Sequence, residues 1–245
     1  MEPASPIKQN APRMSLPRIS VIIPVFNEQD AIEHVIGDLP REMLHEIIVV
    51  DNGSTDKTAE LAKQCGARVV EEAQRGYGNA CLRGIASADT PDIIAFVDGD
   101  YSDHPDEMER VLGPILDGKA DLIIGSRVLG EREPGALLPQ ARFGNWFATA
   151  LISAFFGTDF TDLGPFRAIR KETLDALDMQ DRTFGWTVEM QVKAARARLR
   201  ITEVPVSYRK RIGVSKITGT LEGTIKAGWK ILFTIFKCAA RPQSG

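Results

Sequence analysis

An apolar run ends abruptly in acidic residues in the segment Ile93-Ile-Ala-Phe-Val-Asp98-Gly99-Asp100-Tyr101-Ser102-Asp103-His104-Pro105. An uninterrupted apolar run bounded by Pro91 and Gly99 predicts a strand buried on both faces, as parallel strands covered by helices are. The carboxylates that follow repel one another and lose solvation at the end of a strand. A hard divalent cation such as Mg2+, which binds a few carboxylates together with waters and phosphates, would relieve that repulsion. The alternative is a solvated turn in which Asp103 caps a helix starting near Pro105.

The composition is that of an ordinary globular chain. It has 245 residues, of which 43% are hydrophobic and 26% charged, enough for one large or two small domains. A formal net charge of −3 argues against a general nucleic-acid binder, which would carry a strongly basic surface. The cysteines are scattered without a C-x-x-C pair, so neither a disulfide framework nor a zinc site is indicated. With no secretory leader in the sequence, we expect a cytoplasmic protein.

The two ends of the chain differ from its body. Residues 1–17 carry several prolines among polar residues and are predicted to be a disordered arm. We expect residues 18–216 to form one α/β domain and residues 217–245 to form an amphipathic helix and a tail. The longest apolar run of that helix, residues 231–236, is far shorter than the roughly 20 residues that span a bilayer. Two interpretations stay open. The helix, over residues 217–238, lies on lipid at the inner face of a membrane, or it packs on the domain or on a second copy of the chain.

Short β-branched runs alternate with amphipathic stretches through the body of the chain. This alternation is typical of βαβ units on a mostly parallel, Rossmann-like sheet. The predicted strands are Ile19–Ile23, Glu46–Val50, Ala67–Val70, Ile93–Val97, Asp121–Gly125 and Ile201–Val206.

The residues that follow these strands are mainly charged or polar, and ligands of open α/β sheets bind at the carboxyl ends of strands. Acidic groups there suit a metal or a ribose, and basic groups suit phosphate. Neither a G-x-G-x-x-G after the first strand nor a P-loop is present, so we expect phosphates to be held through a metal ion. For residues 51–56 the plainer alternative is a turn that caps the next helix. The strand-end residues are Asn27, Glu28, Asp51, Arg75, Gly76, Asp98, Asp100 and Arg127.

Several motifs in register resemble a known family. Pro24-Val-Phe-Asn27-Glu28, Asp51-Asn-Gly-Ser-Thr-Asp56, Arg75-Gly76-Tyr-Gly-Asn-Ala and Asp98-Gly99-Asp100 resemble the GT-A fold glycosyltransferases of family 2. Gly125-Ser-Arg127, Arg142 with Gly144-Asn145, Asp162-Leu-Gly-Pro-Phe-Arg-Ala168 and Gly213-Val-Ser-Lys216 resemble the dolichyl- or polyprenyl-phosphate sugar synthase branch. The resemblance covers residues 18 to 220. It implies a UDP- or GDP-linked sugar donor, Mg2+ or Mn2+ on the acidic loop, and inverting transfer of a hexose to a polyprenyl phosphate or other lipid acceptor.

The resemblance also implies roles for individual residues. Donor binding falls to Pro24, Asn27, Glu28, Asp51, Arg75, Gly76, Asp98, Gly99, Arg209 and Lys216, and the acceptor phosphate to Arg127 and Arg142. Asp98 and Asp100 are both metal candidates, and the resemblance favours Asp100 as the direct ligand. Ser102 stands where the family has a Gln, and an extra residue precedes His-Pro, so Ser102, Asp103 and His104 all stay candidates for a further metal ligand.

The acceptor decides whether a catalytic base is needed. A phosphate monoester, with a second pKa of about 6, is already an anionic nucleophile at neutral pH. A hydroxyl acceptor would need a general base, for which Glu189 and Asp162 are the candidates. The alternative for Glu189 is a carboxylate on the face of a helix or a partner of Arg127 or Arg142. A non-catalytic donor-binding or scaffolding subunit is a further hypothesis, against which the retention of both Asp98 and Asp100 argues.

Overall fold

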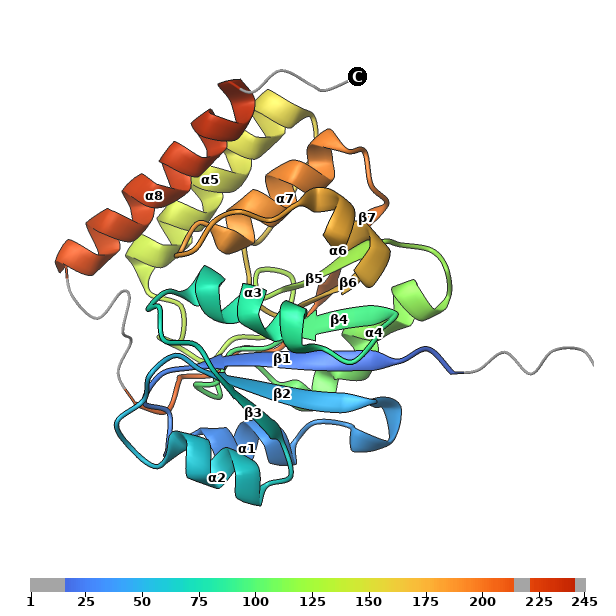
Figure 1. Ribbon diagram of the computed structural model, residues 1–245. Coiled ribbons are helices and arrows are strands. Elements are labelled where there is room, and N and C mark those ends of the chain that lie inside the picture. The colour runs from blue at the N-terminus through green and yellow to red at the C-terminus, as the bar shows by residue number, and fades with distance from the viewer. Residues whose placement is uncertain (1–15, 214–220, 241–245) are drawn as a thin grey trace, which may run out of the picture.

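The computed structural model describes residues 16–213 and 221–240, and within them a seven-stranded sheet in the order β3-β2-β1-β4-β6-β5-β7 (Figure 1). β6 runs antiparallel to its neighbours β4 and β5, and the other pairs are parallel. The prediction of a mostly parallel α/β fold is therefore confirmed. The strands are β1 (Ile19–Val25), β2 (Glu46–Asp51), β3 (Arg68–Glu71), β4 (Ile93–Phe96), β5 (Leu122–Ser126), β6 (Arg167–Arg170) and β7 (Ile201–Pro205).

The six strands expected from the sequence are present with small shifts at their ends, whereas β6 was not expected. Its sequence is Arg-Ala-Ile-Arg, which offers no apolar run for a periodicity argument. Arg167 is nevertheless fully buried, because its guanidinium donates to the backbone carbonyls of Leu163, Gly164 and Thr187. Carbonyl partners thus allow a charged residue to occupy a central strand.

Helices cover both faces of the sheet. One apolar cluster joins α1, α2 and α4 to the sheet, and a second joins α3, α5, α6, α7 and α8 to the opposite face. The helices are α1 (Ile32–Gly37), α2 (Thr58–Gln64), α3 (Tyr77–Ser87), α4 (Met108–Leu116), α5 (Pro139–Phe156), α6 (Lys171–Leu177), α7 (Trp186–Arg196) and α8 (Leu221–Ala240), with 3-10 turns η1 (Arg41–Met43) and η2 (Pro105–Glu107).

A helical turn does begin at Pro105, as expected, but Asp103 does not cap it. The residue preceding η2 is His104, which makes no side-chain capping bond, and the side chain of Asp103 is buried. The interpretation of residues 98–103 as a solvated, capping turn is therefore wrong for Asp103.

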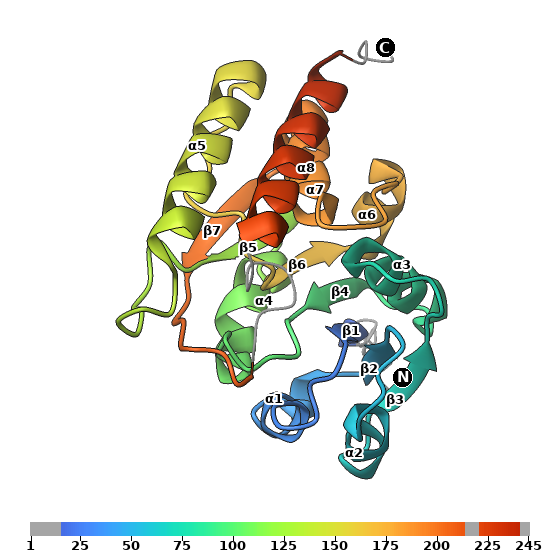
Figure 2. The same ribbon diagram turned by 90° about the vertical axis from the view of Figure 1, so that its left-hand side faces the viewer.

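The described part of the C-terminal helix, α8, packs beside α5 and over α7 (Figures 1 and 2). Ile235 and Cys238 are buried in the core that these helices share, whereas Trp229 on the outer side is 72% exposed. Of the helices in residues 16–213 and 221–240, none is long and apolar enough to cross a bilayer. The predicted arm up to residue 15 and the boundary at residues 216 and 217 lie outside the described residues.

Candidate active site

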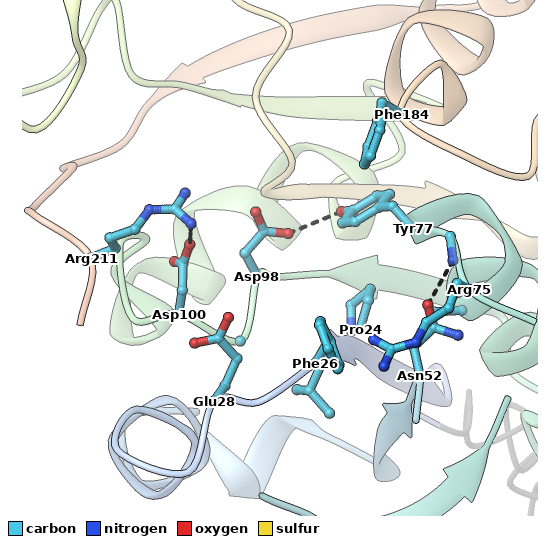
Figure 3. Close-up of a pocket in the computed structure, with 14 residues that line it drawn as sticks. Pro24, Phe26, Glu28, Asn52, Arg75, Tyr77, Asp98, Asp100, Phe184 and Arg211 are labelled. Carbon is cyan, nitrogen blue, oxygen red and sulfur yellow. Dashed lines mark hydrogen bonds and ion pairs between the residues drawn. The ribbon is translucent and has the colours of Figure 1, made fainter. Parts of the chain in front are cut away.

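A cavity of about 300 Å³ opens where β1, β2 and β4 end (Figure 3). In Figure 3 the carboxylates of Glu28, Asp98 and Asp100 lie on one side of it, and Arg75 and Phe26 lie on the other. Its position matches the expectation that ligands bind at the carboxyl ends of the strands. The lining residues are Pro24, Val25, Phe26, Glu28, Asn52, Arg75, Gly76, Tyr77, Ala80, Asp98, Gly99, Asp100, Phe184 and Arg211.

Asn52, directly after β2, holds the basic side of the cavity in place. Its amide nitrogen donates to the carbonyls of Glu72 (2.9 Å) and Gln74 (2.8 Å), and its Oδ1 accepts the N–H of Gly76 (2.8 Å). The Arg75 guanidinium then lies 3.4 Å from the centre of the Phe26 ring, a cation–π contact. This pair forms a flat, charged surface on which a planar base can stack.

Asn27 and Asp51, expected in the nucleoside pocket, accept hydrogen bonds from the loop between β2 and α2. The Asn27 Oδ1 accepts the N–H of Thr55 at 2.8 Å, and the Asp51 Oδ1 accepts the N–H of Ser54 at 2.9 Å. Neither residue lines the cavity. Pro24 and Glu28 of the same predicted group do line it.

The acidic loop after β4 supplies the opposite side. Asp98 Oδ1 accepts the hydroxyl proton of Tyr77 at 3.0 Å. Asp100 Oδ1 accepts the N–H (2.9 Å) and the hydroxyl (2.5 Å) of Ser102, and its Oδ2 lies 2.8 Å from Nη1 of Arg211. These contacts fix the orientations of the Asp98 and Asp100 carboxylates.

The other expected metal ligands lie around this pair. Ser102 and Asp103 are buried behind it, and Asp103 Oδ2 lies 3.4 Å from the backbone nitrogen of Asp98. The ring of His104 is half-buried, with Nδ1 3.7 Å from the carboxylate of Asp106. In the part of the chain that the structure describes, no group of three His, Cys, Asp or Glu side chains is arranged to hold a metal ion by itself.

The electrostatics of the loop favour an added cation. Burial, and then the neighbouring carboxylate of Asp100, raise the pKa of Asp98 above its usual range, and burial with the Asp98 charge raises the pKa of Asp103. Oδ1 of Asp103 is buried and has no hydrogen-bond partner among the described residues. Two carboxylates that share a site with phosphate oxygens and waters match the ligands that Mg2+ or Mn2+ takes. The residues therefore fit a divalent metal bound jointly with a diphosphate.

The segment after β7 is attached directly to the acidic loop. The N–H groups of Arg209 and Ile212 donate to the carbonyls of Ser102 and Asp100, both at 2.9 Å. The guanidinium of Arg209 lies 3.4 Å from the centre of the Tyr101 ring and outside the cavity lining, which Arg211 reaches instead. Lys216, the other expected cation, lies outside the described residues.

Arg127 and Arg142 occupy different surroundings. Asp162 accepts from Arg127 at Nη2 (2.7 Å), Nε (2.8 Å) and the backbone N–H (2.8 Å), in a buried pair. Arg142 is exposed and lines a second hollow of about 540 Å³ beside the first half of α5, together with Arg132 and Trp146. Of the two arginines expected to bind the acceptor, Arg127 is paired with Asp162, whereas Arg142 is exposed beside a hollow.

Glu189, on α7, is buried away from the donor cavity. Its carboxylate accepts the N–H of Gln180 (3.0 Å) and of Asp181 (2.7 Å) and lies 2.9 Å from Nζ of Lys193. Neither Arg127 nor Arg142 is among these partners. Its contacts hold the loop between α6 and α7.

Several cavity residues had no assigned role in the sequence. Asn52 and Tyr77 lie inside the recognised motifs, so their polar groups at strand and helix ends were an available signal. Arg211 lies between Arg209 and Lys216, the two cations expected to bind the donor, but has no expected role of its own. Phe184 reaches the cavity from the loop after α6, and no pattern in the sequence indicates this.

The arrangement of sheet, acidic loop and cavity defines the GT-A fold of nucleotide-sugar-dependent glycosyltransferases. The chain superposes with a TM-score of 0.73 on glucosyl-3-phosphoglycerate synthase from Mycobacterium tuberculosis, solved in complex with Mn2+, UDP-glucose and phosphoglyceric acid. The two share 25% identity over 94% of this chain and 82% of that one. Residues 20–178 match Glycosyl transferase family 2, and the chain belongs to this family.

Proteins with similar sequences indicate the branch of the family to which the chain belongs. It is 36% identical to an uncharacterized glycosyltransferase of Mycobacterium tuberculosis, over 87% of this chain and 97% of the relative. It is 32% identical to the dolichyl-phosphate hexose transferase of Haloferax volcanii (81% and 86%) and 30% identical to the undecaprenyl-phosphate mannosyltransferase of Micrococcus luteus (84% and 90%). The expected family and its polyprenyl-phosphate branch are therefore confirmed.

Proposed function

We propose that the protein transfers a hexose from a UDP- or GDP-linked donor to a polyprenyl phosphate, with inversion and with a divalent metal. The observation that carries this proposal is the meeting of Asp98, Asp100 and Arg211 beside the stacked Phe26 and Arg75 in one cavity. Acidic side chains, a guanidinium and an aromatic surface suit the metal, diphosphate and base of a nucleotide sugar. The names of two relatives supply the acceptor class.

The donor would lie with its base near Phe26 and its diphosphate near the acidic loop. Asp98 and Asp100 would hold a Mg2+ or Mn2+ ion there, and the ion would neutralise charge on the diphosphate leaving group. Arg211 adds a positive charge on the same side, because its guanidinium lines the cavity. Such charge stabilisation is commonly the largest catalytic contribution available to a transferase site.

A phosphate acceptor needs no general base, since its oxygen is already anionic at neutral pH. This agrees with the state of Asp162 and Glu189, whose carboxylates are engaged by several donors each. A hydroxyl acceptor would need a general base, so Asp162 or Glu189 would have to give up some of these hydrogen bonds. Single displacement by the acceptor phosphate inverts the anomeric centre. The exposed Arg142 and Arg132 of the second hollow are our candidates for attracting that phosphate.

The apolar chain of such an acceptor needs an apolar surface. α5 and α8 lie side by side and expose aromatic side chains, and Phe155 and Phe236 meet at 5.6 Å between ring centres. We propose that this surface rests on the inner face of a membrane as an interfacial contact. Its members are Phe143, Trp146, Phe147, Phe155, Trp229, Phe233 and Phe236.

An acceptor screen tests the proposed function. Purified protein with Mn2+ and either UDP-glucose or GDP-mannose is incubated with polyprenyl phosphate, with polyprenol and with soluble sugars. We expect a lipid-linked sugar from polyprenyl phosphate alone, and no product after chelation of the metal. Transfer to polyprenol or to a soluble hydroxyl would contradict the proposal, and so would tight donor binding without any turnover.

A further inference from the structure

The C-terminal helix is connected to the donor cavity through an ion pair between a partly exposed lysine and a buried carboxylate. Nζ of Lys230, on α8, lies 2.8 Å from Oδ2 of Asp181, and the two side chains are 33% and 8% exposed. Asp181 belongs to residues 178–185, which we term the buttress loop, between α6 and α7. The lysine therefore neutralises a carboxylate that has little access to water.

The far side of the buttress loop lies directly against the backbone of the donor site. The Asn79 N–H donates to the Arg182 carbonyl at 3.0 Å. A Cβ atom on Gly76 would overlap the carbonyl oxygen of Arg182, and one on Gly78 would overlap that of Asp181. Only glycine permits this approach, so a shift of the buttress loop toward residues 76–78 would displace the first turn of α3, and a shift away would remove the support of that turn.

That turn carries the groups on both sides of the cavity. Arg75 precedes it and stacks on Phe26, and Tyr77 within it donates to Asp98. Phe184 of the buttress loop lines the cavity itself. The position of residues 178–185 is thus transmitted to the base-stacking surface and to the acidic loop.

The loop has few ways to adjust. Glu189 binds the N–H groups of Gln180 and Asp181, and Asp181 Oδ1 accepts the Thr183 N–H at 2.8 Å. A Cβ atom on Gly185 would lie 2.5 Å from Asp181 Oδ2 and 2.6 Å from the hydroxyl of Thr234 on α8. The loop is therefore clamped between α7 and α8, with Lys230 supplying the charge on the α8 side.

We propose that Lys230 is a positioning residue of the donor site. By pairing with Asp181 it holds the buttress loop against Gly76 and Gly78, and so keeps Arg75 and Tyr77 in the geometry that binds a nucleoside diphosphate. The proposal rests on the proposed function only for the class of ligand. Removal of the lysine leaves a buried carboxylate unpaired, and the loop must move to hydrate it.

The test is a binding experiment on the full chain, with UDP and GDP as probes in the presence of Mn2+ and without any acceptor. By titration calorimetry, Lys230→Met should weaken binding of the preferred nucleotide about tenfold, equivalent to about 1.4 kcal/mol. Lys230→Arg, which keeps the charge, should bind within about twofold of the wild type. Lys237→Met, an exposed lysine on the same helix, is the matched control and should bind unchanged.

A double-mutant cycle separates positioning from general destabilisation. Asp181→Asn should weaken binding about as much as Lys230→Met, and the double variant should be no weaker than either. Additive losses, or a Lys230→Met variant that melts earlier yet binds the nucleotide as the wild type does, would overturn the inference. If the wild type binds neither nucleotide, the donor assignment fails and this inference with it. If it binds but transfers no sugar to polyprenyl phosphate, only the proposed function fails.

Discussion

The acidic loop after β4 and the carboxylates of Asp162 and Glu189 are two acidic regions with different hydrogen-bond environments. Asp162 and Glu189 each accept several N–H donors and face a cation. In the acidic loop the pKa values of Asp98 and Asp103 are raised, and one oxygen of Asp103 has no partner among the described residues. The difference indicates that the acidic loop after β4 is suited to binding a ligand, whereas Asp162 and Glu189 maintain the fold.

The largest effect on activity is expected from Asp100→Ala. The substitution removes a carboxylate from the metal and diphosphate site, and we expect turnover to fall at least about 10³-fold. The measurement is kcat for release of nucleoside diphosphate with polyprenyl phosphate present. Asp106→Ala is the control, because its side chain is 60% exposed at the end of the same loop. Equal activity of Asp100→Ala and the wild type would remove the acidic loop from the reaction.

The largest effect on stability is expected from Asp162→Asn. It leaves the buried Arg127 without a charged partner, at a cost of about 3 kcal/mol in the free energy of unfolding. Urea denaturation measures this quantity. Asp121→Asn, which weakens the pairs with the 56% exposed Arg200 and with Arg170, should cost less, about 1 kcal/mol. A loss no greater in Asp162→Asn than in Asp121→Asn would show that the buried pair does not stabilise the fold.

Glu189→Gln should lower stability while leaving kcat nearly unchanged, which distinguishes Glu189 from the acidic loop most clearly. The substitution removes charged acceptors of two backbone N–H groups and the partner of Lys193, so we expect a loss of about 1–2 kcal/mol in unfolding free energy. Because no base is required, kcat should stay within about threefold of the wild type, although the donor KM can rise through the buttress loop. A fall in kcat of about 10³-fold, with KM unchanged, would make Glu189 a base.

Arg211→Gln should give the smallest effect, with opposite signs for two ligands. Arg211 pairs with Asp100 at 2.8 Å, so its removal should strengthen binding of Mn2+ alone about threefold. The lost positive charge should weaken binding of UDP or GDP about fivefold at saturating Mn2+. Calorimetry measures both. Lys210→Gln is the control, because Lys210 is exposed and carries the same charge one residue earlier. It should change neither the binding of Mn2+ nor the binding of the nucleotide. Weaker binding of both ligands would contradict competition at Asp100.

The sequence predicts the acidic region well because its signals are local. Asp98 and Asp100 directly follow a buried apolar strand, and the motif around Glu28 places that residue at the neighbouring strand end. Both expectations depend only on the rule that parallel strands present their carboxyl ends at one edge. The same reasoning placed Asn27 and Asp51 among the donor ligands, whereas their short side chains bind the adjacent loop. Donor binding by Asn27 and Asp51 stays a prediction.

The partners of Asp162 and Glu189 could not be predicted, because they come from distant or irregular backbone. Asp162 meets Arg127 from 35 residues away, and Glu189 binds N–H groups of a loop that has no periodic pattern. β6 was missed for a related reason. Arg167 and Arg170 are accommodated in the sheet by the carbonyls of Thr187 and Ile115, which lie 20 and 55 residues away in the sequence. Tertiary hydrogen bonds of this kind have no local sequence signature.

The most direct test compares Asp100→Ala and Glu189→Gln in one assay of sugar transfer to polyprenyl phosphate at saturating Mn2+ and donor. We expect Asp100→Ala to lose transfer by at least about 10³-fold and Glu189→Gln to keep kcat within about threefold. If Glu189→Gln instead loses transfer as completely as Asp100→Ala while remaining folded, the division between a ligand-ready acidic loop and carboxylates that maintain the fold is contradicted.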